Sequence, residues 1–125
     1  MFIINSDGTI HLTRGDYATF EVTAKKDENE NYIFQIDDVV RFTVTEKKKC
    51  DSVVLTKEVI ITEVTEKVVM NLNQTETKLG EIIHKPKDYW YEVVLNPETA
   101  PQTIVGYDDN GPKILRLYPE GDDGV

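Results

Sequence analysis

Residues 17–25 read YATFEVTAK and alternate strictly between two kinds of side chain. One set of alternate positions holds Ala18, Phe20, Val22 and Ala24, and the other holds Tyr17, Thr19, Glu21 and Thr23. Because successive side chains of a β-strand point to opposite faces, this two-residue period predicts a strand with one buried face.

The same pattern returns along the whole chain. Val39 to Thr45 alternates in this way, and residues 89–95 give the strongest strand, with Tyr89 and Tyr91 on one face and Trp90 on the other. Further strands are expected at 2–4, 9–12, 32–34, 53–57, 59–64, 67–72, 103–107 and 113–118. A total of about 7–9 strands with almost no helix predicts an all-β, antiparallel β-sandwich, with a barrel as the main alternative.

Turn-forming residues separate these segments. Ser6-Asp7-Gly8 predicts an opening hairpin, the polar residues 25–31 a second hairpin loop, and Asn110-Gly111 a terminal hairpin between 103–107 and 113–118. Residues 73–80 carry helix-capping residues, and at most one helical turn is expected there. The chain is interpreted as one domain over residues 1–125, with 119–125 as a frayed tail.

Charge and composition exclude several classes of function. The 125 residues carry 14 Lys and Arg against 23 Asp and Glu, a net charge of −9. A nucleic-acid binder needs a basic surface, so none is expected as a partner. No apolar run approaches the ~20 residues of a membrane span, and the N-terminus lacks the features of a signal peptide, so neither a membrane partner nor secretion by that route is expected.

Catalytic and metal-binding motifs are not apparent. The chain contains no nucleophile elbow, phosphate-binding loop or zinc motif, and an enzyme would depend on Cys50 with His11 or His84. The single cysteine excludes an internal disulfide and fits a reducing compartment. Acidic loops at 27–31 and 108–111 have the atom types that bind Ca²⁺ but lack the spacing of an EF-hand. We therefore expect no enzyme, no metal, no cofactor and no small-molecule substrate.

Trp90 is the aromatic residue most relevant to binding. It shares one face of its strand with Glu92 and Val94, opposite the tyrosine face. If that face points outward, these three residues form a candidate protein interface, because exposed aromatics are enriched at interfaces. The alternative is that both faces of a central strand are covered and Trp90 belongs to the core. A sugar-binding platform is a third reading.

The order of segments resembles the immunoglobulin-like domain at the N-terminus of phage baseplate upper proteins and of related small prophage proteins. The matching features are Arg14-Gly15-Asp16 followed by a strand, the polar turn that ends at Gly80, and the Tyr89-Trp90-Tyr91 strand. The resemblance spans residues 10–118. Unlike the long baseplate proteins, this chain has no coiled coil or receptor-binding section.

This resemblance implies an immunoglobulin-like sandwich with a non-enzymatic role in a phage or prophage tail. The implied partners are other tail or baseplate proteins, or further copies of the chain. The implied location is the virion, assembled in the cytoplasm of a bacterial host. The alternative interpretation of the residues is a small carbohydrate- or calcium-binding sandwich. Arg14-Gly15-Asp16 itself is expected to be a turn and not an adhesion motif.

Overall fold

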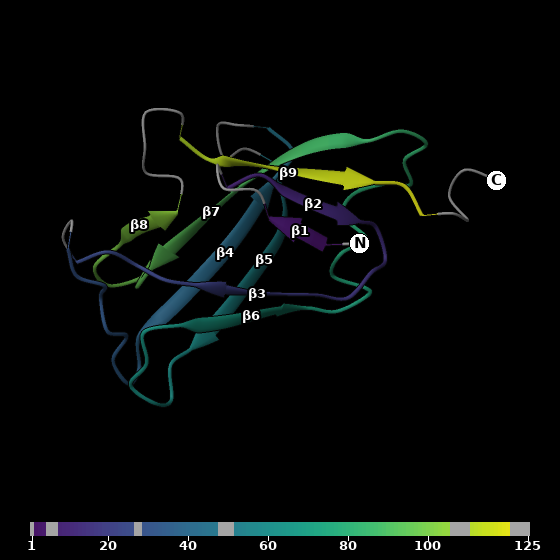
Figure 1. The fold of residues 1–125 in the computed structure, drawn as a ribbon. Coiled ribbons are helices and arrows are strands. Elements are labelled where there is room, and N and C mark those ends of the chain that lie inside the picture. Colours follow the sequence, from purple (N-terminus) through teal and green to yellow (C-terminus); the bar gives the residue numbers. More distant parts are fainter. Residues whose placement is uncertain (1, 5–7, 27–28, 48–51, 106–110, 121–125) are drawn as a thin grey trace.

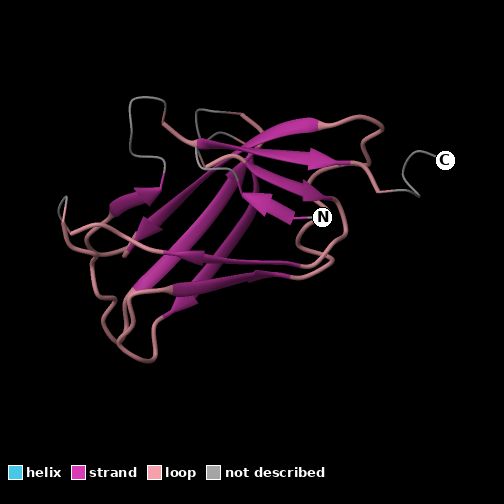
Figure 2. Cartoon of the chain, in the orientation of Figure 1, coloured by secondary structure: helices cyan, strands magenta, loops and turns pink. Residues whose placement is uncertain are grey.

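The computed structural model describes residues 2–4, 8–26, 29–47, 52–105 and 111–120. Within these residues the chain forms strands and loops, with no helix (Figure 2). The strands are β1 (Phe2–Ile4), β2 (Ile10–Thr13), β3 (Ala18–Val22), β4 (Val39–Thr45), β5 (Val53–Ile60), β6 (Val68–Leu72), β7 (Lys87–Leu95), β8 (Gln102–Val105) and β9 (Lys113–Tyr118). The prediction of an all-β fold is confirmed.

The strands form two sheets that face each other. A seven-stranded sheet has the order β1-β2-β9-β7-β4-β5, with β8 beside β7, and a two-stranded sheet pairs β3 with β6. Figure 1 shows β3 and β6 crossing one side of the larger sheet. The other side of the larger sheet is left uncovered by any described strand.

The core lies between the two sheets and follows from the predicted alternation. Phe20 of β3, Phe42 of β4 and Tyr91 of β7 meet there, with ring centroids 5.3 Å apart for Phe20 and Phe42 and 5.5 Å apart for Phe42 and Tyr91. Phe42 is fully buried. Aromatic side chains bury large apolar areas, so this row of rings contributes strongly to the attraction between the sheets.

The expectation of a purely antiparallel sandwich is wrong at one position. Strand β2 pairs with β9 in parallel, and Ile10 lies opposite Leu115. Only strands joined by a tight turn are forced to be antiparallel, whereas β2 and β9 are separated by most of the chain. The opening hairpin, in contrast, is confirmed by the antiparallel pairing of β1 with β2.

The predicted terminal hairpin is also wrong. Both β8 and β9 pair antiparallel with β7, so they run in the same direction, one after the other, along a single edge of β7. Strand β9 covers residues 87–91 of β7 and β8 covers 93–95. The hairpin partner of β8 is therefore β7, through the turn at residues 96–101.

Three local predictions complete the comparison. In place of the expected strands at 53–57 and 59–64 there is one strand, β5, which ends at Ile60, and residues 61–64 form no strand. Residues 32–34 form no strand and are held by single bridges, Lys25 to Asn31 and Phe34 to Thr65. Residues 74–77 form a turn without a helix, as expected. The turn at 48–51 and the tail at 121–125 lie outside the described residues.

Candidate interaction surface

The uncovered face of the larger sheet carries the three residues singled out by the sequence. Along β7, buried and half-buried residues alternate, and Tyr89, Tyr91, Val93 and Leu95 are the buried ones. Trp90, Glu92 and Val94 are half-buried on the opposite side. Trp90 therefore lies on the outward face and not in the core. We call Trp90, Glu92 and Val94 the Trp90 strip.

Residues of the two neighbouring strands flank the Trp90 strip. On β4, Thr45 lies opposite Trp90 and Thr43 lies opposite Glu92. On the other side, Ile114 of β9 pairs with Trp90. Cross-strand neighbours on one face of a sheet have Cβ atoms ~4.5–5.5 Å apart, so these side chains cover part of the indole. The half-buried state of Trp90 fits this position between two neighbouring strands.

Ion pairs flank the strip at one end. Arg41 of β4 donates hydrogen bonds from Nε and Nη2 to Glu58 of β5, at 2.9 and 2.8 Å, and from Nη2 to Glu98, at 2.7 Å. These bonds, to Glu98 first and then to Glu58, raise the pKa of Arg41. Such exposed pairs add little stability, but they fix the guanidinium beside Val94, its register partner.

A second ion pair flanks the other end. Arg116 of β9 donates from Nε and Nη2 to the two carboxylate oxygens of Asp88, at 2.8 and 3.3 Å. The hydrogen bond to Asp88 raises the pKa of Arg116. Beyond this pair, the imidazole of His11 stacks on Tyr118 and its Nδ1 lies 2.9 Å from the tyrosine hydroxyl. The face thus carries the two apolar side chains of the strip, with Glu92 between them and charges of both signs around them.

A polar clamp that the sequence analysis did not identify holds β4 against the end of β7. The Asn96 backbone N–H donates to the Val39 carbonyl at 2.7 Å, and the Asn96 Oδ1 accepts the Val39 N–H at 2.9 Å. The Asn96 Nδ2 donates to Asp38 at 3.1 Å. Asn96 adopts a positive φ of 49°, which asparagine tolerates better than most residues. No sequence pattern links these residues, because Asp38 and Asn96 belong to distant parts of the chain.

Asp38 is the charged member of this clamp. Its Oδ2 accepts hydrogen bonds from the Tyr32 hydroxyl at 2.6 Å and from the Gln35 backbone N–H at 2.8 Å. Burial favours the neutral carboxyl, but the bonds from Tyr32, Gln35 and Asn96 together outweigh burial and lower the pKa of Asp38. The hydrogen bond to Asp38 is also the main cause of a raised pKa of Tyr32, and burial is the second cause.

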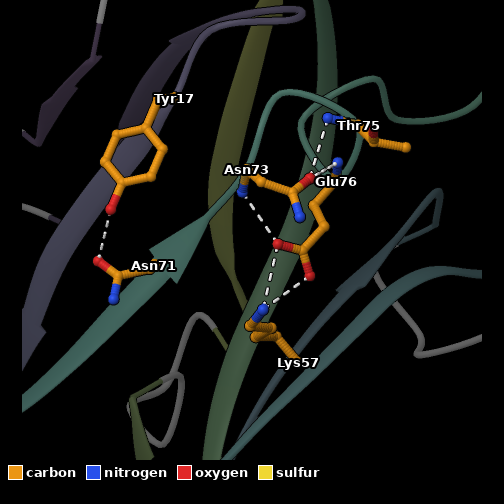
Figure 3. A network of polar contacts seen from close by, with 6 residues as sticks. All are labelled: Tyr17, Lys57, Asn71, Asn73, Thr75 and Glu76. Atoms are coloured by element: carbon orange, nitrogen blue, oxygen red, sulfur yellow. Dashed lines mark hydrogen bonds and ion pairs between the residues drawn. The ribbon is translucent and has the colours of Figure 1, made fainter.

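A second polar network closes one side of the sandwich (Figure 3). Lys57 lies opposite Phe42 in the register of β5 with β4, so its side chain starts on the core-facing side. Its Nζ reaches the Glu76 carboxylate, at 2.9 and 3.1 Å, in the turn that follows β6. An inward-pointing charge on an edge strand also discourages unwanted strand pairing.

The other residues considered for chemistry do not converge in the described part of the chain. His84 is exposed, His11 contacts Tyr118, and Cys50 lies outside the described residues. No group of three or more His, Cys, Asp or Glu side chains suited to a metal occurs among the described residues. The acidic loops at 27–31 and 108–111 lie partly outside them. In the Arg14-Gly15-Asp16 segment, Arg14 is buried, which does not suit an adhesion loop.

The described part of the chain holds no helix long and apolar enough to cross a membrane. Comparison of the chain with protein-family models, with curated proteins and with solved structures gave no match.

Proposed function

We propose that the chain is a non-enzymatic structural protein of a phage or prophage tail or baseplate, and that it acts through protein–protein contacts at the Trp90 strip. The observation that carries the proposal is the outward, half-buried Trp90 at the centre of a sheet face that no described strand covers. Tryptophan is enriched among the residues that dominate binding energy at interfaces.

The strand order supports the finer part of the proposal, an immunoglobulin-like sandwich. In such domains the second and fifth strands of the standard order share one sheet, while the third, sixth and seventh share the other. Here β3 and β6 form one sheet, and β4, β7 and β9 are neighbours in the other, with β5 at the edge as in the variable type. The row of Phe20, Phe42 and Tyr91 joins the two sheets through β3, β4 and β7, and in this proposal it takes the role of the inter-sheet disulfide and tryptophan of antibody domains.

The proposal also requires a face that can meet a partner without a large cost of desolvation. Ile114 extends the apolar surface of Trp90 onto β9, Val94 lies further along β7 beyond Glu92, and the charges of Arg41 and Arg116 are already paired with carboxylates. A partner with an apolar centre and polar rim would bury the indole while these paired charges stay at the wet edge.

The experiment combines light scattering at high protein concentration with pull-down assays against the tail proteins encoded beside this chain. The wild type should self-associate or bind a neighbouring tail protein, and Trp90→Ser should weaken that contact at least tenfold. Tyr17→Ser is the matched control, because Tyr17 is an exposed aromatic outside the larger sheet. A strictly monomeric protein that binds none of these proteins contradicts the proposal. A response in a glycan array, or a Ca²⁺-dependent thermal shift, favours the carbohydrate- or calcium-binding alternative instead.

A further inference from the structure

Exposed apolar side chains gather at the end of the molecule where β5 finishes and β6 begins. Among the described residues, eight large hydrophobic side chains are exposed. Five of them lie on the segments 33–36 and 60–69, and we call these five the end patch: Ile33, Ile36, Ile60, Val64 and Val69. Large exposed apolar groupings are uncommon on monomeric proteins and mark interaction sites.

Backbone contacts hold the two segments of the end patch together. Phe34 and Thr65 exchange hydrogen bonds, with the Phe34 N–H 2.8 Å from the Thr65 carbonyl and the Thr65 N–H 3.2 Å from the Phe34 carbonyl. The Asp37 N–H donates to the Ile61 carbonyl and the Ile61 N–H donates to the Asp38 carbonyl, both at 2.9 Å. In Figure 1 the corresponding loops lie at the end of the molecule where β4 starts. These bonds hold the segments that carry Ile33, Ile36 and Val64 side by side at this end of the molecule.

Two hollows give the end patch its shape. Ile60 and Val69 line the first, of about 260 Å³, which runs from β5 to β6 across the open side of the sandwich. Ile33 lines the second, of about 440 Å³, together with Glu30 and Glu66. The first hollow has an apolar wall that can accept the side chains of a docked segment, whereas the second is lined by polar residues apart from Ile33.

The charges on the rim determine which partner fits. Among the described residues, Lys67 is paired with Glu21 at 3.5 Å and Lys26 with Glu30 at 3.9 Å. No described ion pair involves the exposed carboxylates beside the apolar side chains. These carboxylates are Asp37, Glu63 and Glu66, and the cations near them are Lys25 at the second hollow and Lys67 at the first.

We propose that the end patch binds a segment of another protein that has Lys or Arg between its apolar residues. The apolar residues of that segment enter the first hollow and contact Ile33 at the second, and its cations meet Asp37, Glu63 and Glu66. Charge excludes the main competitors. A second copy of this chain, with a net charge of −9, would bring further carboxylates to the rim, and an anionic membrane surface would be repelled in the same way.

Trp90 itself lies far from the end patch, whereas Val94 of the strip pairs with Arg41 and lies nearer to it, so Trp90 is the residue that tests the strip independently. Trp90 pairs with Thr45 at one end of β4, and Ile60 pairs with Val39 at the other end. Six residues of strand correspond to roughly 20 Å. The proposal for the end patch therefore does not depend on the function proposed for the strip.

The test uses the full chain and a short soluble peptide of alternating Val and Lys, with a peptide of alternating Val and Glu as the charge control. Backbone amide spectra recorded during titration report both affinity and place. We expect the Lys peptide to shift amides of residues 33–37 and 60–69 with a Kd of about 0.1–1 mM, and the Glu peptide to shift none. Raising the salt concentration should weaken the contact.

Two variants and a matched control locate the site. Val64→Ser should weaken binding of the Lys peptide about tenfold through loss of apolar contact, and Glu63→Gln combined with Glu66→Gln about three- to tenfold through loss of charge. Ile82→Ser, at another exposed aliphatic outside the end patch, should leave it unchanged. Equal binding of both peptides, shifts elsewhere on the protein, or absence of binding at about 1 mM would overturn the proposal. Concentration-dependent dimerisation that Val64→Ser abolishes would overturn it as well, since the end patch would then bind a second copy.

Discussion

Replacing Glu76 by Gln should make the protein less stable in a pH-dependent way, because Glu76 joins the turn after β6 to the edge strand β5. The Glu76 Oε1 accepts the Asn73 backbone N–H at 2.9 Å, and both its oxygens accept from Lys57. In return, the Asn73 Oδ1 accepts the backbone N–H groups of Thr75 at 3.0 Å and Glu76 at 2.8 Å. This reciprocal arrangement is a capping box (Figure 3).

The size of the effect follows from what each substitution removes. Gln keeps an acceptor for the Asn73 N–H but loses the charge that Lys57 faces, and both side chains are only partly buried, at 21% and 32% exposure. A charge-assisted bond in such a place contributes about 0.5–1.5 kcal/mol to the free energy of unfolding. Glu76→Ala also removes the acceptor of the Asn73 N–H, for a total loss of about 2 kcal/mol.

The pH dependence has a definite sign. Burial raises the pKa of Glu76, but the hydrogen bonds from Asn73 and Lys57 and the charge of Lys57 outweigh it, so the pKa lies below its ordinary value. The contribution of Glu76 is therefore complete above the unfolded pKa of about 4.3 and is lost as the pH falls through the lower folded value. The difference in stability between wild type and Glu76→Gln should shrink on acidification from about pH 7 to about pH 3.

Urea denaturation followed by fluorescence of the single tryptophan measures both the loss of stability and its dependence on pH. A loss of about 1 kcal/mol moves the midpoint by roughly 0.5 M urea. A double-mutant cycle with Lys57→Met isolates the ion pair, and a coupling of about 0.5–1.5 kcal/mol is expected. The reasoning fails if the cycle shows no coupling, or if Glu76→Gln is as destabilising at about pH 3 as at neutral pH.

Three further predictions follow from the core, a glycine and the polar clamp. Phe42→Ala should reduce the free energy of unfolding by about 3–5 kcal/mol, because Phe42 is fully buried between Phe20 and Tyr91; urea denaturation measures the loss, and Phe42→Leu should cost clearly less. Gly80→Ala should be more destabilising than Gly111→Ala by about 1 kcal/mol or more, as measured by thermal unfolding. Both glycines have a positive φ, but a Cβ at Gly80 would lie 2.6 Å from the Tyr89 hydroxyl, whereas a Cβ at Gly111 meets open space. Asn96→Ala should reduce the free energy of unfolding by about 2 kcal/mol at neutral pH, because it removes the side-chain hydrogen bonds to Val39 and Asp38. Asn96→Asp should regain stability on mild acidification, because protonation relieves the repulsion from Asp38. Similar dependence of stability on pH for the two variants would contradict the clamp.

Local periodicity predicted the strands well because it reports directly on burial. The alternation of residues 39–45 and 89–95 was recovered as β4 and as most of β7, and the same alternation placed Trp90 opposite the buried tyrosines. The sequence left open whether the Trp90 face was covered. Whether this face is covered depends on the number of strands in the second sheet, which has two. The alternation along a single strand carries no information on that number.

Pairing between strands that are distant in the sequence explains the two wrong predictions, the terminal hairpin and the purely antiparallel sandwich. Asn110-Gly111 favours a tight turn locally, yet β7 is nine residues long and β9 pairs with only its first part. The rest of that edge would expose unpaired backbone groups, and β8 satisfies them by lying in line with β9. Likewise the parallel pairing of β2 with β9 and the clamp between Asp38 and Asn96 join residues that share no local pattern.

The two proposed surfaces differ in a way that assigns them different partners. Around the Trp90 strip, Arg41 is paired with Glu58 and Glu98, and Arg116 is paired with Asp88, so charges of both signs lie close to the indole. A two-fold contact between copies requires a surface that complements itself, and a surface that carries both arginines and carboxylates can meet that requirement. The end patch carries an excess of carboxylates and would repel its own copy. Contacts between copies are therefore expected at the Trp90 strip and contacts with a basic partner at the end patch. It follows that Trp90→Ser should reduce self-association without changing the affinity for the Lys peptide, and that Val64→Ser should do the reverse.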